Sequence, residues 1–195
     1  AVRVMTRMMK PAMDLFRDMS IKSGCFIDDG LIVNKDPEVL TIETKFVLET
    51  LQLAGWQINT EKTRPIPSQN PIYQGFILDF VAMEYRLPVW KCEAAIAAID
   101  KLLEDSKGGR YIQVKEITSV LGKCISAKKS HGPSMQVALR HCQHEVGKRV
   151  MHRGPEQEGD WTVFSPIDDQ AREELEYVKY ILMGKNGYLM PQHIE

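Results

Sequence analysis

The chain has 195 residues, of which 44% are hydrophobic, and a formal net charge of −1 at pH 7. This length and hydrophobic share allow a buried core in one domain or in two small ones. No run of about eighteen apolar residues occurs, and the Met-rich start carries basic residues, which argues against a membrane span and a signal peptide. The four scattered cysteines form no C-x-x-C pair, so we expect reduced thiols in a soluble, intracellular protein.

Charge is distributed unevenly along the chain. Between Lys107 and Arg153 there are ten Lys or Arg residues but only two acids, Glu116 and Glu145, which gives this block a net charge of +8. Because the whole chain carries −1, the remainder carries −9. Such a basic block predicts a surface for an anionic polymer.

The first half of the chain alternates helical and β-prone patterns. Residues 2–19 are rich in Met, Leu and Phe, which predicts a largely buried helix that Pro11 kinks or restarts. Two short β-prone runs flank the turn signal Asp28-Asp29-Gly30 and predict a tight hairpin. Asp36-Pro37 then marks a helix start, and Gly55 marks the end of that helix.

A short strand is expected at Trp56–Asn59, and a second hairpin is expected from the runs 72–80 and 83–87. Pro88 ends this hairpin, and everything after it has a helical pattern. Four helices are expected, over residues 91–106, 114–127 and 132–146 and after Ser165-Pro166. The fold class is therefore α+β, with an α+β lobe followed by a helical lobe and a boundary near Pro88.

The adjacent carboxylates of Asp28 and Asp29 are the first candidates for chemistry. Like charges this close together are costly unless a cation lies between them. Hard oxygen ligands select Mg²⁺, which can also bridge substrate phosphates during phosphoryl transfer. The alternative is that Asp28-Asp29-Gly30 simply forms the turn, because Asp and Gly are favoured there on conformational grounds.

Phe26-Ile27-Asp28-Asp29 resembles the aromatic-x-Asp-Asp box of reverse transcriptases. Later segments are similar to further motifs of this family, in the same order. They are Gly55-Trp56 with Asn59-x-Glu61-Lys62-Thr63, the primer-grip-like run Tyr73–Asp79, Leu87-Pro88-x-x-Lys91, Ile117-x-x-Val120-x-Gly122-Lys123, and Asp160-Trp161 with Asn186-Gly187. The resemblance is to gypsy-like or DIRS-like retroelement enzymes and covers nearly the whole chain.

This resemblance implies the C-terminal part of a polymerase palm at residues 1–88, built of antiparallel hairpins with helices. An all-helical thumb at 89–153 and a connector at 154–195, preceding an RNase H-like region, would follow. The implied activity is RNA-directed DNA polymerisation by two-metal nucleotidyl transfer on an RNA/DNA primer-template. Upstream palm and fingers would be partners, and so would RNase H of the same polyprotein.

A third carboxylate lies upstream of the double Asp in this family, and the earlier acids here are Asp14 and Asp18, both on the first predicted helix. We therefore expect the chain to be inactive by itself.

The family's roles transfer only to matching residues. Asp28 and Asp29 would be catalytic ligands of Mg²⁺ or Mn²⁺. Gln74, Gly75 and Phe76 would hold the primer end. Lys62 would contact the nucleotide or protonate pyrophosphate, with a solvated surface lysine as the alternative.

The basic block predicts nucleic-acid contacts independently of the family resemblance. We expect five cations on its helices to neutralise phosphates without reading sequence. They are Lys115, Lys123, Lys128, Lys129 and Arg140. An ordinary charged helix surface is the alternative. A zinc site among Cys124, His131, His141, Cys142 and His144 is disfavoured, because their spacing matches no known zinc finger.

Two other functions stay open. A domesticated palm-thumb remnant would act as a non-catalytic scaffold for nucleic acid or protein. An unrelated α+β interaction domain would make the ordered motifs a coincidence.

Overall fold

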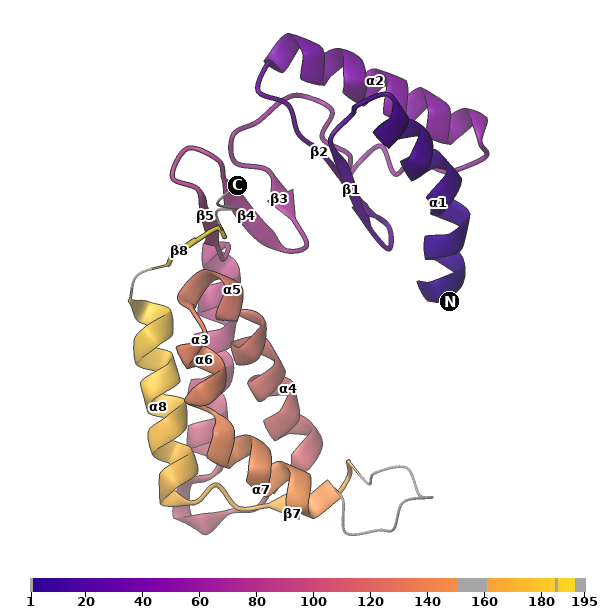
Figure 1. Ribbon diagram of the computed structural model, residues 1–195. Helices are drawn as coiled ribbons and strands as arrows, with labels where there is room; N and C mark the ends of the chain where they lie inside the picture. Colours follow the sequence, from indigo (N-terminus) through magenta and orange to yellow (C-terminus); the bar gives the residue numbers. More distant parts are fainter. Residues whose placement is uncertain (1, 151–160, 185, 192–195) are drawn as a thin grey trace. The chain divides into compact units, whose positions relative to one another are not determined.

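The computed structural model describes residues 2–150, 161–184 and 186–191, and the chain divides into two compact units (Figure 1). The N-terminal unit is Ala1–Gln74 and the C-terminal unit is Gly75–Glu195. Both combine helices with short antiparallel strands, so the α+β class expected from the sequence is confirmed. No helix among the described residues is long and apolar enough to cross a membrane.

Two helices and a β-hairpin form the N-terminal unit. Its elements are α1 (Val2–Asp18), β1 (Ser23–Phe26), β2 (Asp29–Ile32), α2 (Pro37–Leu53) and β3 (Ile72–Tyr73). Phe16, Ile21 and Val47 are its buried core, and the ring of Phe16 meets that of Phe46 edge to face at 6.3 Å between centroids. This small core holds both helices against the hairpin.

The helix α1 departs from expectation in two respects. It continues through Pro11 instead of restarting there. It is also not largely buried, because four large apolar side chains on it or directly after it are at least 42% exposed. They are Val4, Met8, Leu15 and Met19.

Local capping explains the limits of α2. The Asp36 carboxylate accepts hydrogen bonds from the backbone N–H groups of Glu38 and Val39 at 2.8 and 3.3 Å. At the other end Gly55 has φ +87°, its N–H donates to Gln52, and the N–H of Trp56 donates to Leu51. These two bonds form a Schellman motif, which needs the left-handed conformation that glycine tolerates.

The strand expected at Trp56–Asn59 is wrong, since these residues form no ladder in the described part of the chain. Asn59 forms a turn instead. Its side-chain oxygen accepts from Lys62 N–H at 3.1 Å, and its backbone carbonyl accepts from Thr63 N–H at 2.9 Å. Hydrogen bonding within this Asx-type turn replaces strand pairing.

Antiparallel strands and helices build the C-terminal unit. The strands are β4 (Phe76–Asp79), β5 (Glu84–Arg86), β6 (Ile112–Gln113), β7 (Phe164–Ser165) and β8 (Tyr188–Leu189). The helices are α3 (Val89–Asp105), the 3-10 turn η1 (Lys107–Gly109), α4 (Val114–Ser126), α5 (Lys128–His131), α6 (Ser134–Val137), α7 (Arg140–Val150) and α8 (Asp169–Met183). In the sheet, β5 lies between β4 and β8, and β6 pairs with β7.

The run expected to be one strand at 72–80 is interrupted. Gln74 and Gly75 have φ values of +50° and +78°, so the chain turns between β3 and β4. The helix expected over 132–146 is also divided, into α6 and α7. Ala138 between them keeps right-handed angles, and the adjacent Leu139 is fully buried.

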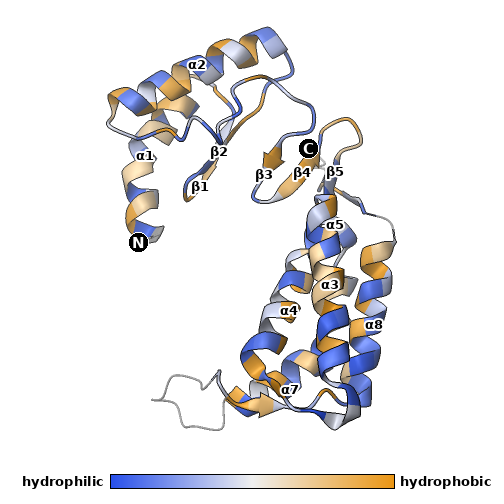
Figure 2. Ribbon diagram, turned by 180° about the vertical axis from the view of Figure 1, so that it is seen from behind, coloured by the Kyte–Doolittle hydropathy of each residue, from blue (hydrophilic) through white to orange (hydrophobic). Residues whose placement is uncertain are grey.

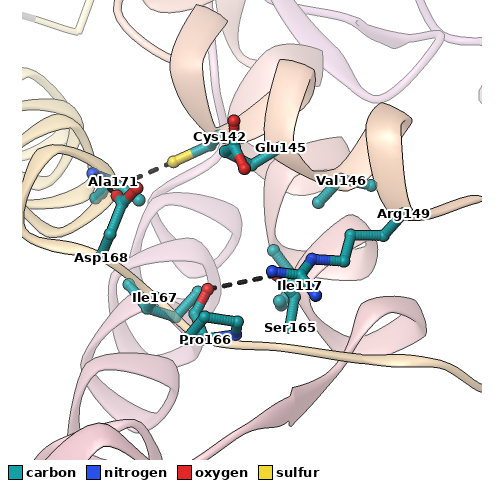
Figure 3. A pocket seen from close by; sticks show the side chains of 10 residues that line it. All are labelled: Ile117, Cys142, Glu145, Val146, Arg149, Ser165, Pro166, Ile167, Asp168 and Ala171. Carbon is teal, nitrogen blue, oxygen red and sulfur yellow. Dashed lines mark hydrogen bonds between the residues drawn. The ribbon is translucent and has the colours of Figure 1, made fainter.

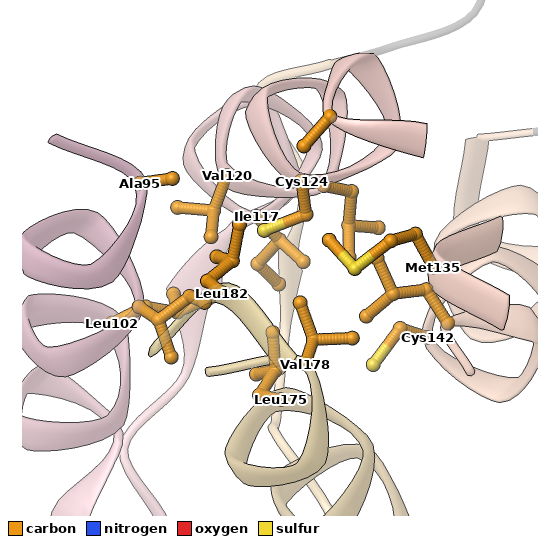
Figure 4. Close-up of a cluster of buried hydrophobic side chains, with 14 of the residues drawn as sticks. Ala95, Leu102, Ile117, Val120, Cys124, Met135, Cys142, Leu175, Val178 and Leu182 are labelled. Carbon is orange, nitrogen blue, oxygen red and sulfur yellow. The ribbon is translucent and has the colours of Figure 1, made fainter. Parts of the chain in front are cut away.

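The core of the C-terminal unit comes mainly from α3, α4, α7 and α8 (Figure 4). Hydrophilic and hydrophobic residues alternate around these helices, as an amphipathic packing pattern requires (Figure 2). Leu175, Val178 and Leu182 of α8 pack with the buried residues of α3 and α4. Residues 161–191 therefore belong to the same body as the helices before them.

The observed division differs from the boundaries expected near residues 88 and 153. The two units divide at Gln74 and Gly75, and the β4–β5 hairpin stays with the helices. Asn186 contributes to this arrangement, because its side chain accepts from Leu87 N–H at 2.9 Å and donates to Leu87 C=O at 2.6 Å. Asn186, 99 positions further along the chain, thus supplies hydrogen-bond partners for the backbone N–H and C=O of Leu87 just after β5.

Candidate metal and nucleic-acid sites

The hairpin that carries Asp28 and Asp29 turns one residue earlier than expected. Pairing of β1 with β2 extends to Phe26 opposite Asp29, so Ile27 and Asp28 form the two-residue turn. Ile27 has φ +56°, a left-handed conformation that is unusual for a β-branched residue. The Cys25 thiol donates to the Ile27 carbonyl at 3.5 Å across this turn. Such local strain is found more often at functional sites than elsewhere.

Both carboxylates are solvent-exposed, Asp28 in the turn and Asp29 at the start of β2. Their negative charge affects the pKa values of neighbouring groups in the same unit. Burial raises the pKa of the Cys25 thiol, and the charges of Asp28 and Asp29 raise it further. The pKa of Tyr73 is raised by burial and, more weakly, by Cys25 and Asp29, against the opposing effect of its hydrogen bond with Gln74. Tyr73 on β3 is thus a neighbour of the carboxylate hairpin, which the sequence did not indicate.

The donor set of this hairpin fits a metal that keeps open positions. Across the described residues, no group of three or more His, Cys, Asp or Glu side chains is arranged to hold a metal. Asp14 is already engaged on α1, since its carboxylate pairs with Lys10 at 3.0 Å and Arg17 at 2.8 Å. Mg²⁺ characteristically uses one or two carboxylates with water and substrate phosphates. Asp28 and Asp29 match that pattern and do not form an all-protein cage.

The primer-grip-like residues Gln74, Gly75 and Phe76 lie at the turn before β4 and in its first position. Phe76 is only 9% exposed and belongs to the hydrophobic core. Its ring is therefore not available for stacking on a nucleotide base. A role in holding a primer end would fall to the backbone of this turn and to the cations around it.

Two lysines lie beside this turn. Lys91 of α3 donates from Nζ to the Gly75 carbonyl at 3.0 Å. A Cβ atom at position 75 would meet the same Nζ, which is the movable end of a flexible side chain, so the φ of +78° is what favours glycine there. Lys129 of α5 places its Nζ 5.7 Å from the centroid of the Phe76 ring, within cation–π range. The sequence reasoning missed Lys91 as a site residue, because only the fold brings it to Gly75.

The exposed side of α4 carries further cations with small residues between them. Lys115, Ser119, Gly122 and Ser126 follow helical spacing of three or four residues and are not buried. A Cβ atom at Gly122 would meet no other atom within 4 Å, so the surface is open there. Lys123 is exposed beside this row. The exposed acid Glu116 lies beside Lys115, so this side of α4 carries both signs of charge near its start and Lys123 toward its end.

The other predicted cations are distributed over two helices. Lys128 and Lys129 are exposed on α5, which follows α4 after one residue, and Lys128 donates to the Gln136 side chain at 3.3 Å. Arg140 is exposed at the first position of α7. Lys62 belongs to the N-terminal unit, where it is exposed in the turn that Asn59 organises.

His141 and Cys142, two of the five residues weighed for a zinc site, lie at the contact between α7 and α8. His141 Nε2 lies 2.8 Å from an oxygen of Asp168, and the N–H groups of His141 and Cys142 donate to the Glu174 carboxylate at 3.0 and 2.9 Å. Burial raises the pKa of the Cys142 thiol strongly, and Glu174 raises it further. The Glu174 carboxylate thus accepts from two N–H groups in the first turn of α7 and joins this helix to α8, and no group of three or more His, Cys, Asp or Glu side chains among the described residues is arranged to hold a metal.

A pocket of about 120 Å³ adjoins that contact, between α7 and the segment leading into α8 (Figure 3). Ile117, Val146 and Ile167 contribute apolar walls, while Glu145 and Asp168 contribute carboxylates. None of the predicted nucleic-acid residues lines this pocket.

The chain matches no known protein family, curated protein or solved structure.

Proposed function

We propose that the chain is part of an RNA-directed DNA polymerase that binds an RNA/DNA primer-template. Its C-terminal unit would contact the duplex, and Asp28 and Asp29 would be metal ligands on one side of a two-metal site. The observation that carries the proposal is the cationic turn of the C-terminal unit. There Lys91 contacts Gly75 and Lys129 lies over Phe76, and the exposed cations of α4 belong to the same unit. This surface supports neutralisation of phosphates without base readout.

The carboxylate hairpin supports the second part of the proposal. Asp28 and Asp29 would hold Mg²⁺ or Mn²⁺, which in this chemistry would stabilise charge on the transferring phosphate. Phe26, Asp28 and Asp29 are all exposed around the turn, so a substrate can approach them. A third carboxylate is then needed from another segment, and upstream palm and fingers are the proposed source. RNase H of the same polyprotein is proposed as a further partner of this chain.

A non-catalytic palm-thumb remnant is the second candidate. It is favoured by one observation, which is that Asp28 and Asp29 do not form part of a three-residue metal group in the described chain. A scaffold of this kind would keep the lysine surface and bind nucleic acid, but would not need the carboxylates.

Binding of a labelled RNA/DNA hybrid, followed by fluorescence anisotropy across a salt series, tests the duplex surface. We expect sequence-indifferent binding whose affinity falls steeply with salt. Reversing Lys123, Lys128 and Lys129 together to Glu should weaken binding at low salt by about tenfold or more, because several phosphate contacts are lost.

A matched control reverses Lys22, Lys35 and Lys45 to Glu, which changes the net charge equally within the N-terminal unit. If both triple variants bind alike, the affinity reflects net charge alone and the assigned surface is wrong. Replacing Asp28 and Asp29 by Asn should leave this binding intact in the absence of divalent metal, which separates the metal proposal from the duplex proposal.

A further inference from the structure

Folding leaves the indole side chain of Trp90 in solvent at the start of α3. Trp90 is the second residue of this helix and is 62% exposed, and Val89 before it is 68% exposed. Isolated apolar side chains of this kind are common on protein surfaces. The exposure by itself therefore assigns no role to Trp90, and the groups around the ring decide what it can bind.

A lysine holds the indole beside the turn that precedes β4. The ammonium group of Lys91 lies over the Trp90 ring, 5.3 Å from its centroid and within cation–π range. The same ammonium group donates to the Gly75 carbonyl at 3.0 Å. All three residues belong to the C-terminal unit. The exposed ring thus has a positive charge beside it, while most of the side chain is open to solvent.

A second cation lies at the same end of the β4–β5 hairpin. Lys129 of α5 lies over the ring of Phe76, the residue after Gly75, with its ammonium group 5.7 Å from the ring centroid. Lys91 contacts Gly75 itself. Two cations from different helices therefore flank a segment of two residues, and one of these cations also lies over the exposed indole.

The acids of the hairpin lie at its other end. Asp79 and Glu84 face each other at the turn between β4 and β5, and Arg86 pairs with them at 3.1 and 3.3 Å. On α3, Glu93 is exposed three residues after Trp90. The hairpin acids therefore form their own ion pairs away from Gly75, and Glu93 is the acid nearest to Trp90 along its own helix.

We propose that Trp90 stacks on an unpaired base of a nucleic-acid strand, while Lys91 and Lys129 neutralise phosphates of that strand. Proteins that bind single strands combine aromatic rings for the bases with cations for the backbone, and this cluster offers both. The cations beside the ring favour a ligand that is anionic as well as aromatic. Because every base has a π face, this contact is indifferent to base identity.

The inference rests on the proposed contact of this unit with nucleic acid and adds the form of the ligand. Bases within a duplex stack on one another, so a paired stretch offers phosphates but no free base. A single-stranded overhang offers both. The cluster is thus a site for the unpaired part of a primer-template, and Trp90 occupies an unassigned position in the segment Leu87-Pro88-x-x-Lys91.

Fluorescence of a single tryptophan tests the stacking. The chain has three tryptophans, and replacing Trp56 and Trp161 by Phe leaves Trp90 as the reporter. Single-stranded oligothymidylate at low salt should quench the Trp90 emission, because a base lies against the ring. An abasic strand of the same length carries the same phosphates and should not quench it. An RNA/DNA hybrid with a thymidylate overhang should likewise quench the emission more than the same hybrid with an abasic overhang.

Affinity for the same strands is the second measurement. Trp90→Ala should weaken binding of oligothymidylate about fivefold or more, and Trp90→Phe should weaken it less, because a smaller ring still stacks. Lys129→Ala should weaken binding of the base-bearing and the abasic strand alike, since it removes charge only. Trp161→Ala is the matched control, because Trp161 is 47% exposed in the same unit, and it should change neither affinity. Circular dichroism checks that every variant stays folded.

Equal quenching by the abasic and the base-bearing strand would refute the stacking, and so would unchanged oligothymidylate binding by folded Trp90→Ala. These outcomes are separate from those for the duplex surface. If reversal of Lys123, Lys128 and Lys129 weakens hybrid binding while Trp90 does not respond to either strand, the stacking fails and the proposed function stands. If Trp90 responds but that reversal leaves hybrid binding unchanged, the stacking is supported and the assigned duplex surface is wrong.

Discussion

The ammonium group of Lys129 lies 5.7 Å from the centroid of the Phe76 ring, which links a predicted thumb lysine to the predicted primer-grip hairpin. The two residues are far apart in the sequence and come from α5 and from β4. Phe76 packs in the core while Lys129 is exposed, so this contact places a surface cation against a buried aromatic ring.

Replacing Phe76 by Ala should destabilise the C-terminal unit by about 3 kcal/mol, because a buried aromatic ring is removed and a cavity remains. Urea unfolding followed by circular dichroism measures the change. Phe26→Ala is the matched control, and because Phe26 is 54% exposed its cost should stay below about 1 kcal/mol. Equal losses for the two variants would contradict the burial assigned to Phe76.

Gly75→Ala should cost about 1–2 kcal/mol of folding free energy, chiefly because φ +78° disfavours a side chain, and the new Cβ also displaces the Lys91 ammonium from its hydrogen bond to the Gly75 carbonyl. The cost of displacing this flexible side chain is the small part that should disappear when Lys91 is shortened. A double-mutant cycle with Lys91→Ala, measured by denaturant unfolding, isolates that part. Strict additivity of the two substitutions would show that Lys91 does not occupy the space above Gly75.

Acid should destabilise the C-terminal unit through His131. Burial lowers the pKa of His131, and its Nε2 has no hydrogen-bond partner among the described residues. The unfolded chain therefore binds this proton at a higher pH than the folded chain does. Stability should fall as the pH drops below about 6.5, the ordinary value for histidine, and should level off below the lowered folded-state pKa.

Denaturant midpoints measured at a series of pH values check this dependence. His131→Gln should flatten the curve between pH 7 and pH 5. His144→Gln serves as the control because its side chain is 65% exposed, and this variant should leave the slope unchanged. A slope that survives His131→Gln would assign the acid sensitivity to another group.

The chain by itself should not extend a primer in Mg²⁺ or Mn²⁺, because two carboxylates without a third do not complete a two-metal polymerase site. Incorporation of labelled nucleotide on an RNA/DNA primer-template measures this. Templated extension by the purified chain would overturn the expectation, and its loss in Asp28→Asn would then identify the carboxylates as catalytic. If a separate upstream fragment restores extension, the scaffold alternative fails.

Sequence reasoning located the features that arise from interactions within a few residues. Asp36 caps α2 and Gly55 ends it as expected, because capping hydrogen bonds connect neighbours along the chain. The hairpin around Asp28 was also found, displaced by one residue, since the turn residue Ile27 adopts a conformation that its type rarely takes.

The tertiary structure alone decided which distant residues meet. Lys91 reaches the Gly75 carbonyl and Asn186 holds the backbone of Leu87, and no local pattern encodes either contact. The break of the expected strand at Gln74 and the joining of α8 to the core have the same origin, because burial is a competition among all apolar surfaces of the unit. Turns and caps follow from the sequence by itself because their partners are adjacent, whereas Lys91 and Lys129 meet Gly75 and Phe76 only when folding brings α3 and α5 to that hairpin.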